Sequence, residues 1–228
     1  MNKLEQFFRY FIDYGGYKTV LKGLQNTFII AFGGLLIGIV LGSVVATVKL
    51  AGTRSKAAKI ISYVGDVYTG LFRGTPIVVQ LIIFHFVIFR GALPSPWEAT
   101  LVFGLNSGAY VAEIMRGGIQ SIDPGQLEAG RTLGLSYVTT MVRIVIPQAI
   151  KNVIPTLGNE LIALIKDTSV AAYAATIDLN AAFTAIAGAT YDYMVPYIML
   201  ALVYLVIVII LTVIIKLIER RLRKSEKR

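Results

Sequence analysis

Cysteine is absent from the 228 residues, and charged residues make up only 15% of them. Without cysteine the chain has no disulfide and no thiolate chemistry. The single histidine, His85, lies in the apolar run 81–89, and one histidine without cysteine cannot supply the ligands of an ordinary zinc site. We expect His85 to be an interfacial or packing residue and predict no metal site. An enzyme is the least expected class, because the sequence has no Gly-x4-Gly-Lys-[Ser/Thr] phosphate loop and no nucleophile–base constellation.

Long apolar runs dominate instead, since 56% of the residues are hydrophobic. A helix needs roughly 20 apolar residues to cross a bilayer, and five segments reach this length. They are residues 24–48, 58–88, 98–115, 148–168 and 194–217. The sequence therefore predicts an all-α membrane protein with about five transmembrane helices. The second segment is long enough to bend, and Gly74 and Pro76 offer a place for the bend.

Two flanking regions are expected to lie at the outer membrane surface. Residues 1–22 mix basic and aromatic side chains, which is typical of an amphipathic helix in the interface. The first apolar run that follows lacks a small-residue cleavage site, so we expect no removable signal peptide. Residues 169–192 are less hydrophobic than their neighbours, and we expect short outer helices there with Asp178 and Asp192 in water.

Basic residues give a net charge of +9 and cluster beside the apolar segments. This placement is typical of a topogenic signal, so no nucleic-acid partner is predicted. With a cytoplasmic C-terminus, 15 basic residues face inward and 5 outward, as the positive-inside rule favours. The inward residues are Lys49, Arg54, Lys56, Lys59, Arg116, Arg131, Arg143, Lys151, Lys216, Arg220, Arg221, Arg223, Lys224, Lys227 and Arg228, and the outward ones are Lys3, Arg9, Lys18, Lys22 and Arg90. We predict an outer N-terminus and a basic cytoplasmic tail, 218–228.

The first apolar segment carries glycines at every fourth position, Gly34, Gly38 and Gly42. Glycines at this spacing line one face of a helix and let another backbone approach closely. The approaching helix could belong to a second subunit or to the same chain, and the sequence leaves both interpretations open.

A polar stretch, residues 123–147, interrupts the apolar pattern. Asp123 can cap a helix, Pro124 suits its first position, and Gln126 completes a capping-box spacing. The helix is expected to run to Leu133, with Gly134 as a left-handed C-cap and Ser136 capping the next helix. A helix of about ten residues is not stable alone in water, so it must lie against another surface. Gly130 within it is tolerable if that surface approaches closely.

The stretch Glu128-Ala129-Gly130-x3-Gly134-x9-Ile144-x-Ile146-Pro147 resembles the Glu-Ala-Ala loop of importer permeases of the ATP-binding cassette (ABC) class. Gly130 and Ile146 depart from that pattern, where a second alanine and a leucine stand. Three further motifs resemble the branch of the family that imports polar amino acids. They are Phe72-Arg73-Gly74-Thr75-Pro76, Ser107-Gly108-Ala109-Tyr110-Val111-Ala112-Glu113 and Lys166-Asp167-Thr168-Ser169.

The resemblance implies a type I ABC importer permease in a prokaryotic cytoplasmic membrane. It implies a dimer of permease subunits, two cytoplasmic ATPase subunits and an extracytoplasmic amino-acid-binding protein. Residues 23–217 would form the permease domain, with a cytoplasmic coupling loop over 116–147. The residues expected to couple to the ATPase are Asp123, Glu128, Ala129, Gly130, Leu133, Gly134 and Pro147. ATP and magnesium would bind to the partner ATPase, and no cofactor is predicted in this chain.

Four charged residues fall inside the predicted spans, where an unpaired charge is costly: Asp66, Arg73, Glu160 and Lys166. One interpretation is a cavity in which Asp66 and Glu160 meet a cationic ligand, with Thr69 and Asn106 as further contacts. The other is internal pairing of Asp66 with Arg73 and of Glu160 with Lys166.

An acidic cavity favours an ammonium or guanidinium group. We therefore predict import of basic amino acids such as arginine, lysine or histidine, with neutral glutamine as the alternative. A proton-coupled secondary transporter is the rival class, although it gives no reason for the capped loop.

Overall fold

The computed structural model describes residues 2–51 and 56–224. Arg54 and the end of the basic tail, with Lys227 and Arg228, lie outside the described residues. The described chain is helical and contains no strand. Its elements are α1 (Lys3–Ile12), α2 (Gly16–Ala51), α3 (Lys56–Gly74), α4 (Ile77–Ile83), the π-helix η1 (Phe84–Phe89), α5 (Trp97–Gln120), α6 (Pro124–Thr132), α7 (Tyr137–Thr140), the π-helix η2 (Met141–Val145), α8 (Ile146–Asp167), the 3-10 helix η3 (Thr168–Ala174), α9 (Leu179–Thr190) and α10 (Met194–Lys224).

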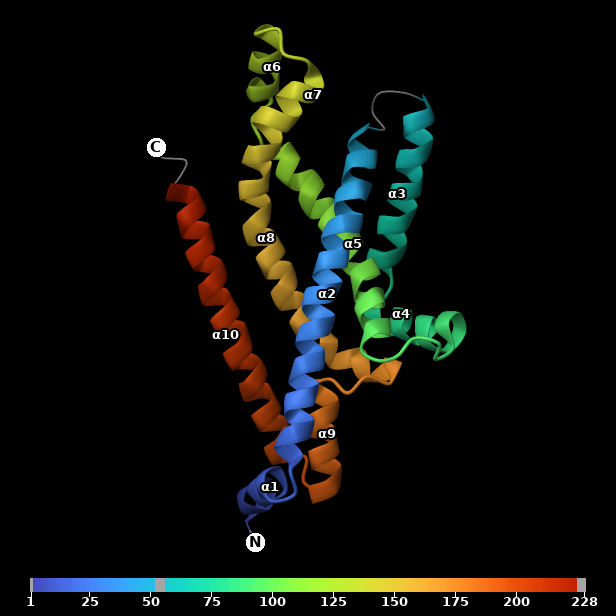
Figure 1. The fold of residues 1–228 in the computed structure, drawn as a ribbon, viewed down its shortest axis with the longest axis vertical. Coiled ribbons are helices and arrows are strands. Elements are labelled where there is room, and N and C mark those ends of the chain that lie inside the picture. The colour runs from blue at the N-terminus through green and yellow to red at the C-terminus, as the bar shows by residue number, and fades with distance from the viewer. Residues whose placement is uncertain (1, 52–55, 225–228) are drawn as a thin grey trace.

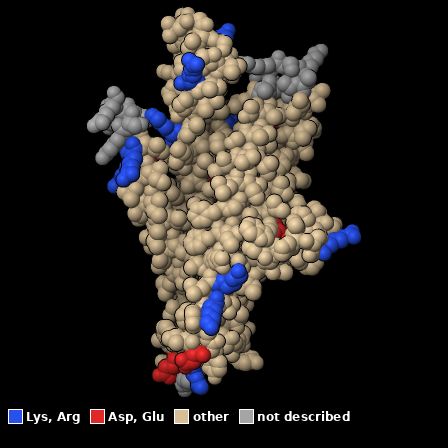
Figure 2. Space-filling view, in the orientation of Figure 1, with Lys and Arg blue, Asp and Glu red and all other residues tan. Residues whose placement is uncertain are grey.

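The long helices run roughly along the long axis of the molecule, and the short α4 projects sideways between its two ends (Figure 1). Helices α6 and α7 form one tip, while α1 and α9 lie at the opposite end with the N-terminus. Helix α10 diverges from the others toward the end that carries α6 and α7. On the face shown in Figure 2, charged side chains gather mainly toward the two ends of the molecule. The surface between them is mostly uncharged, as expected of a protein embedded in lipid.

Length and apolar composition alone support two of the five predicted spans, and up to four if each bent pair of helices counts as one span. Among the described residues, α2 and α10 are long and apolar enough to cross a membrane over Gly16–Leu50 and Met194–Leu222. Two bent pairs of helices qualify jointly, 59–74 with 77–89 and 137–174 with 179–190. Helix α5 has 24 residues and is long enough to cross a membrane, but it is not apolar enough to be recognised by composition. Glu98, Glu113 and Arg116 interrupt its apolar sequence.

The predicted interfacial helix is shorter than expected and lies against the protein. Helix α1 ends at Ile12, Gly15 with φ +73° turns the chain, and α2 begins at Gly16 rather than near residue 23. Gln6 Nε2 donates to the carbonyl of Thr190 at 2.9 Å, and Lys3 Nζ lies 3.0 Å from Asp192 Oδ1. The expectation that Asp192 lies in water is therefore wrong, since it is 8% exposed.

The prediction for Asp178 is wrong as well, because this residue is fully buried. Its carboxylate accepts the backbone N–H groups of Asn180 and Ala181, both at 3.0 Å, and so caps the first turn of α9. A capping carboxylate satisfies helix-end donors that would otherwise have no partner. The residues between α8 and α10 thus form short helices, η3 and α9, but both acids are buried in the protein.

The glycine stripe packs within the chain, between α2 and α5. A Cβ atom added at Gly34 would lie 3.1 Å from Phe103 Cβ, one at Gly38 would lie 2.8 Å from Ser107 Oγ, and one at Gly42 would lie 2.7 Å from Val111 Cβ. The distances at Gly38 and Gly42 are shorter than any ordinary contact of a Cβ atom, so these two positions have no room for a side chain. The helix that approaches the glycine stripe is therefore α5 of the same chain, and not a helix of a second subunit.

His85 also has a more specific place than packing alone. Its Nδ1 lies 3.0 Å from Glu98 Oε1 and 3.2 Å from Oε2, and Glu98 is only 1% exposed. The pair joins η1 to the first turn of α5 and gives the buried carboxylate a hydrogen-bonding partner, which a buried charge requires. Among the described residues no group of three or more potential metal ligands of the His, Cys, Asp or Glu type is found.

We predict that Gly42→Ala lowers the melting temperature of the detergent-solubilised protein, whereas Gly70→Ala does not. Alanine favours a helix over glycine by about 1 kcal/mol at either position. The added methyl meets Val111 at position 42 but meets nothing within 4 Å at position 70. Overpacking of this kind costs roughly 1–3 kcal/mol. Equal melting temperatures for the two variants would contradict close packing at the stripe.

Candidate functional site

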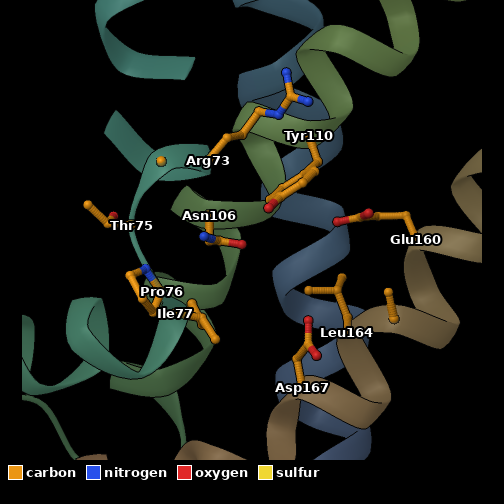
Figure 3. Close-up of a pocket in the computed structure, with 11 residues that line it drawn as sticks. Arg73, Thr75, Pro76, Ile77, Asn106, Tyr110, Glu160, Leu164 and Asp167 are labelled. Atoms are coloured by element: carbon orange, nitrogen blue, oxygen red, sulfur yellow. The ribbon is translucent and has the colours of Figure 1, made fainter. Parts of the chain in front are cut away.

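A pocket of about 450 Å³ opens beside the sharp bend between α3 and α4. The axes of the helices on either side of this bend, 59–74 and 77–89, meet at 104°, so Gly74 and Pro76 break the segment as predicted. The bend, α5 and α8 each contribute to the wall (Figure 3). The lining residues are Arg73, Gly74, Thr75, Pro76, Ile77, Asn106, Tyr110, Glu160, Ala163, Leu164 and Asp167.

Arg73 occupies one side of the pocket at the end of α3. Its guanidinium carbon lies 5.3 Å from the centre of the Tyr110 ring on α5, which is within the range of a cation–π contact. The predicted pairing of Arg73 with Asp66 is therefore replaced by stacking on an aromatic ring. Arg73 is exposed, and Figure 3 shows its guanidinium group beside Tyr110, at the end of the pocket away from Asp167.

Two carboxylates, from Glu160 and Asp167, belong to α8. Residues seven apart on a helix lie on the same face, two turns from each other. Figure 3 shows Glu160 extending from α8 toward Tyr110 and Asn106 on the opposite wall. Glu160 Oε1 accepts a hydrogen bond from Ser107 Oγ at 3.0 Å, which replaces the predicted pairing with Lys166.

Asn106 lines the pocket as predicted, but its amide nitrogen is already used. Nδ2 donates to the carbonyl of Phe72 at 3.1 Å and to Gln80 Oε1 at 3.0 Å. The side-chain oxygen points away from the bend (Figure 3) and is the atom left to accept a hydrogen bond from a ligand.

Asp66 and Thr69, the other two predicted substrate residues, do not line this pocket. They belong to an ionic cluster that joins α2, α3 and α5. Lys49 Nζ lies 2.9 Å from Asp66 Oδ1 and 2.7 Å from Glu113 Oε1, and it donates to Thr69 Oγ1 at 3.4 Å. Arg116 Nη2 completes the cluster at 2.6 Å from Glu113 Oε2. Their role in substrate binding stays a prediction without a place in the pocket.

Sequence reasoning missed Tyr110 and Asp167 as pocket residues and treated Arg73 as an internal partner. A signal existed for all three, since each lies in a motif that resembles the amino-acid branch of the family. Asp167 also stands seven positions after Glu160, so one helical face would carry both acids. Sequence reasoning instead placed Glu160 in one cavity with Asp66, which pairs with Lys49 outside the pocket.

The predicted coupling loop forms a separate feature at the tip of the molecule. Helix α6 begins after Asp123, whose Oδ1 accepts the N–H of Gly125 at 2.8 Å. The predicted capping-box contact of Gln126 is replaced by a 3.5 Å contact between its Oε1 and Gln148 Nε2. Gly134 has φ +83° and ends the helix as expected.

Helix α7 begins after Ser136, whose hydroxyl accepts the N–H of Thr139 at 3.1 Å. Pro147 lies in the first turn of α8, where the missing N–H of proline is tolerated, and is exposed.

One face of α6 is free in the single chain. Glu128 and Arg131 are exposed, and Leu133 at the end of the helix is 81% exposed, which is unusual for leucine. A hollow of about 770 Å³ beside this face is lined by Leu127, Glu128, Arg131, Thr132 and Tyr137. A short helix that presents charge and an apolar tip on one face has the features of a docking element.

Gly130 lies on the opposite, buried face of α6. A Cβ atom added there would collide with Thr140 Cγ2 of α7. The expected close approach is therefore made by the chain itself. Gly130 lets α6 sit directly against the start of the long helix that continues into α8.

These features define a class: an all-helical membrane permease with a polar pocket between its helices and an exposed helix at one tip. Residues 34–224 match the family "Binding-protein-dependent transport system inner membrane component", and the chain belongs to this family. The predicted resemblance to permeases of amino-acid ABC importers is confirmed.

Several relatives carry amino-acid names. The arginine transport system permease protein ArtQ of Bacillus subtilis (strain 168) is 38% identical over 210 residues, which cover 91% of this chain and 94% of that protein. A putative glutamine transport system permease protein, GlnP, of Rickettsia bellii (strain RML369-C) is 34% identical over 214 residues, covering 89% and 92%. A crystal structure of an amino acid ABC transporter with histidines contains a chain that is 35% identical, with a TM-score of 0.83 and coverage of 94% and 98%.

We predict that Gly130→Ala loosens α6 and that adding Thr140→Ser partly restores it. Serine lacks the methyl group, which is the nearest atom to the new Cβ, but it keeps the hydroxyl that donates to the Ser136 carbonyl at 2.9 Å. Because that hydroxyl oxygen would itself lie 2.9 Å from the new Cβ, the rescue is expected to be partial. Trypsin cleavage after the exposed Arg131 reports local opening of α6. Cleavage should be faster in the single variant and should return toward the wild-type rate in the double variant. A single variant cleaved at the wild-type rate would show that α6 does not depend on this contact.

Proposed function

We propose that the chain is the permease subunit of an ABC importer for basic amino acids and that the pocket beside the α3–α4 bend receives them. The observation that carries this proposal is the charge of the pocket, in which Glu160 and Asp167 lie opposite Arg73. Its volume of about 450 Å³ falls within the roughly 300–1,000 Å³ typical of small-molecule sites.

The charges match a basic amino acid better than a neutral one. In apolar surroundings a charge is tolerated when it is paired, so a bound ligand and its site are expected to balance. The Arg73 guanidinium suits the α-carboxylate, which it can bind with two parallel hydrogen bonds. The two carboxylates of α8 then suit the α-ammonium and a second cationic group, as arginine or lysine supplies.

Neutral glutamine is the second candidate, because relatives of this chain carry glutamine in their names. It would pair the α-ammonium with one carboxylate and leave the other without a cation. Whichever carboxylate pairs with the α-ammonium, the Asn106 side-chain oxygen could accept a hydrogen bond from the glutamine amide.

We predict that Glu160→Gln and Asp167→Asn each raise the arginine concentration for half-maximal uptake by at least about tenfold, the loss expected when a hydrogen bond between charged groups is removed. Asp13→Asn is the matched control, since it removes the same charge at an exposed position outside the pocket, and should leave this concentration near the wild-type value. Radiolabelled arginine uptake into proteoliposomes holding the assembled importer measures all three.

If Glu160→Gln assembles normally and its arginine concentration for half-maximal uptake is unchanged, the acidic pocket is rejected as the site for basic amino acids. Wild-type uptake of glutamine but not arginine would favour the second candidate.

The exposed face of α6 supports a docking role toward a cytoplasmic ATPase subunit. Two permease subunits, two ATPase subunits and an extracytoplasmic binding protein would form the importer, with ATP and magnesium bound to the ATPase. With α6 in the cytoplasm, the N-terminus lies outside, because α1 and α6 lie at opposite ends of the long axis (Figure 1).

We predict that Glu128→Arg lowers both ATP-driven uptake and the amount of ATPase that copurifies with the permease. The change reverses a charge on the exposed face of α6, and misplaced like charges in an interface are repulsive. Asp13→Arg makes the same charge reversal at the exposed end of α1 and should leave ATPase copurification unchanged.

Uptake that needs no ATP and collapses when the proton gradient is dissipated would support the secondary-transporter alternative.

A further inference from the structure

The bend between α3 and α4 creates a backbone problem that the pocket depends on. The last carbonyl groups of a helix lose their intrahelical N–H partners, and here the next helix leaves at 104°. Pro76 cannot donate a backbone hydrogen bond, and Gly74 and Thr75 are exposed. In apolar surroundings such carbonyls need a donor from elsewhere in the protein.

Gln80, one turn into α4, places its side-chain amide nitrogen against two carbonyl groups of the bend. Its Nε2 lies 2.9 Å from the Phe72 carbonyl oxygen, 3.1 Å from the Thr75 carbonyl oxygen and 2.8 Å from Thr75 Oγ1. The Thr75 hydroxyl in turn donates to the Leu71 carbonyl at 2.8 Å. Gln80 is 6% exposed, which is unusual for glutamine and is consistent with a fully used amide.

The same amide fixes the bend against α5. Gln80 Oε1 accepts from Asn106 Nδ2 at 3.0 Å, and that nitrogen also donates to the Phe72 carbonyl at 3.1 Å. Asn106 lies one helical turn before Tyr110, the ring on which Arg73 stacks. The two amides therefore hold together the wall that carries Arg73 and the wall that carries Tyr110.

We infer that Gln80 is a positioning residue for the pocket: it does not line the cavity, but it sets the placement of residues 73–77 against α5. The inference rests on the proposed function of the pocket as the amino-acid site. A glutamine in this role acts through its amide N–H groups and not through its volume. An apolar side chain of similar length at position 80 would fill the space and leave the carbonyl groups of Phe72 and Thr75 without this donor.

The test compares Gln80→Met, which keeps the side-chain length, and Gln80→Glu, which keeps the shape but removes the N–H donors, with Gln25→Met at an exposed position of α2. Each variant is measured in the assembled importer as the arginine concentration for half-maximal stimulation of ATP hydrolysis, per unit of intact complex. Both Gln80 variants should raise it by at least about tenfold, as expected when buried hydrogen-bonding groups lose their partner. Gln25→Met should not change it.

A purely structural role gives a different result. Gln80 variants that assemble in smaller amounts but keep the wild-type half-maximal concentration would overturn the inference.

A second readout does not depend on transport and uses the absence of cysteine from the sequence. Ala163→Cys places one thiol on the α8 wall of the pocket, opposite the bend. Displacement of the bend by Gln80→Met should change the rate at which a small thiol reagent modifies it by several-fold, with no amino acid present. If arginine and glutamine fail to stimulate the wild-type importer, the proposed function fails and this rate still decides the role of Gln80. A modification rate that Gln80→Met leaves unchanged would overturn the positioning role of Gln80.

Discussion

The structure depends on one constraint: within an apolar environment, each backbone break and each charge needs a partner inside the protein. The bend at Pro76 is possible because two side-chain amides from α4 and α5 take up its free carbonyl groups. The same rule explains Lys49, which lies between two carboxylates from different helices. It also explains why Glu98, almost fully buried, has His85 beside it.

Close helix packing decides where these partners meet. Because glycines on α2 let α5 approach its backbone, the opposite face of α5 is fixed in place and turns Asn106 and Tyr110 toward the bend. Tyr68 on α3 adds a second tie by donating to the Leu105 carbonyl of α5 at 2.6 Å. The pocket is therefore bounded on one side by a rigid α2–α5 pair. Its other wall, α8, belongs to the helix that begins near the tip of the molecule.

Local signals in the sequence predicted local structure well. Asp123, Gly134 and Ser136 mark the ends of α6 and α7 because capping depends on a few adjacent residues. The break at Gly74 and Pro76 was readable for the same reason. The partners of the buried charges could not be read from the sequence, since Lys49 and Asp66 are 17 positions apart and meet only after α2 and α3 fold together. Asp178 and Asp192 were misplaced because nothing in their neighbourhood reveals that α2 packs against the start of α9 or that Lys3 of α1 pairs with Asp192.

The Gly130–Thr140 contact gives the two functional regions a mechanical connection. Residues 137–174 form one helical run, so α7, which touches α6, and the segment that carries Glu160 and Asp167 belong to the same rod. At about 1.5 Å per residue, Glu160 lies roughly 35 Å along this rod from Tyr137. Under the proposed function, a displacement of α6 by a docked ATPase would press on Thr140, and the run can bend at the π-helix η2, at Pro147 and at Pro155. The acids of α8 would then move relative to Arg73, which the amides of Gln80 and Asn106 hold on the α5 side. The proposed docking face and the pocket would then be connected through directly packed helices.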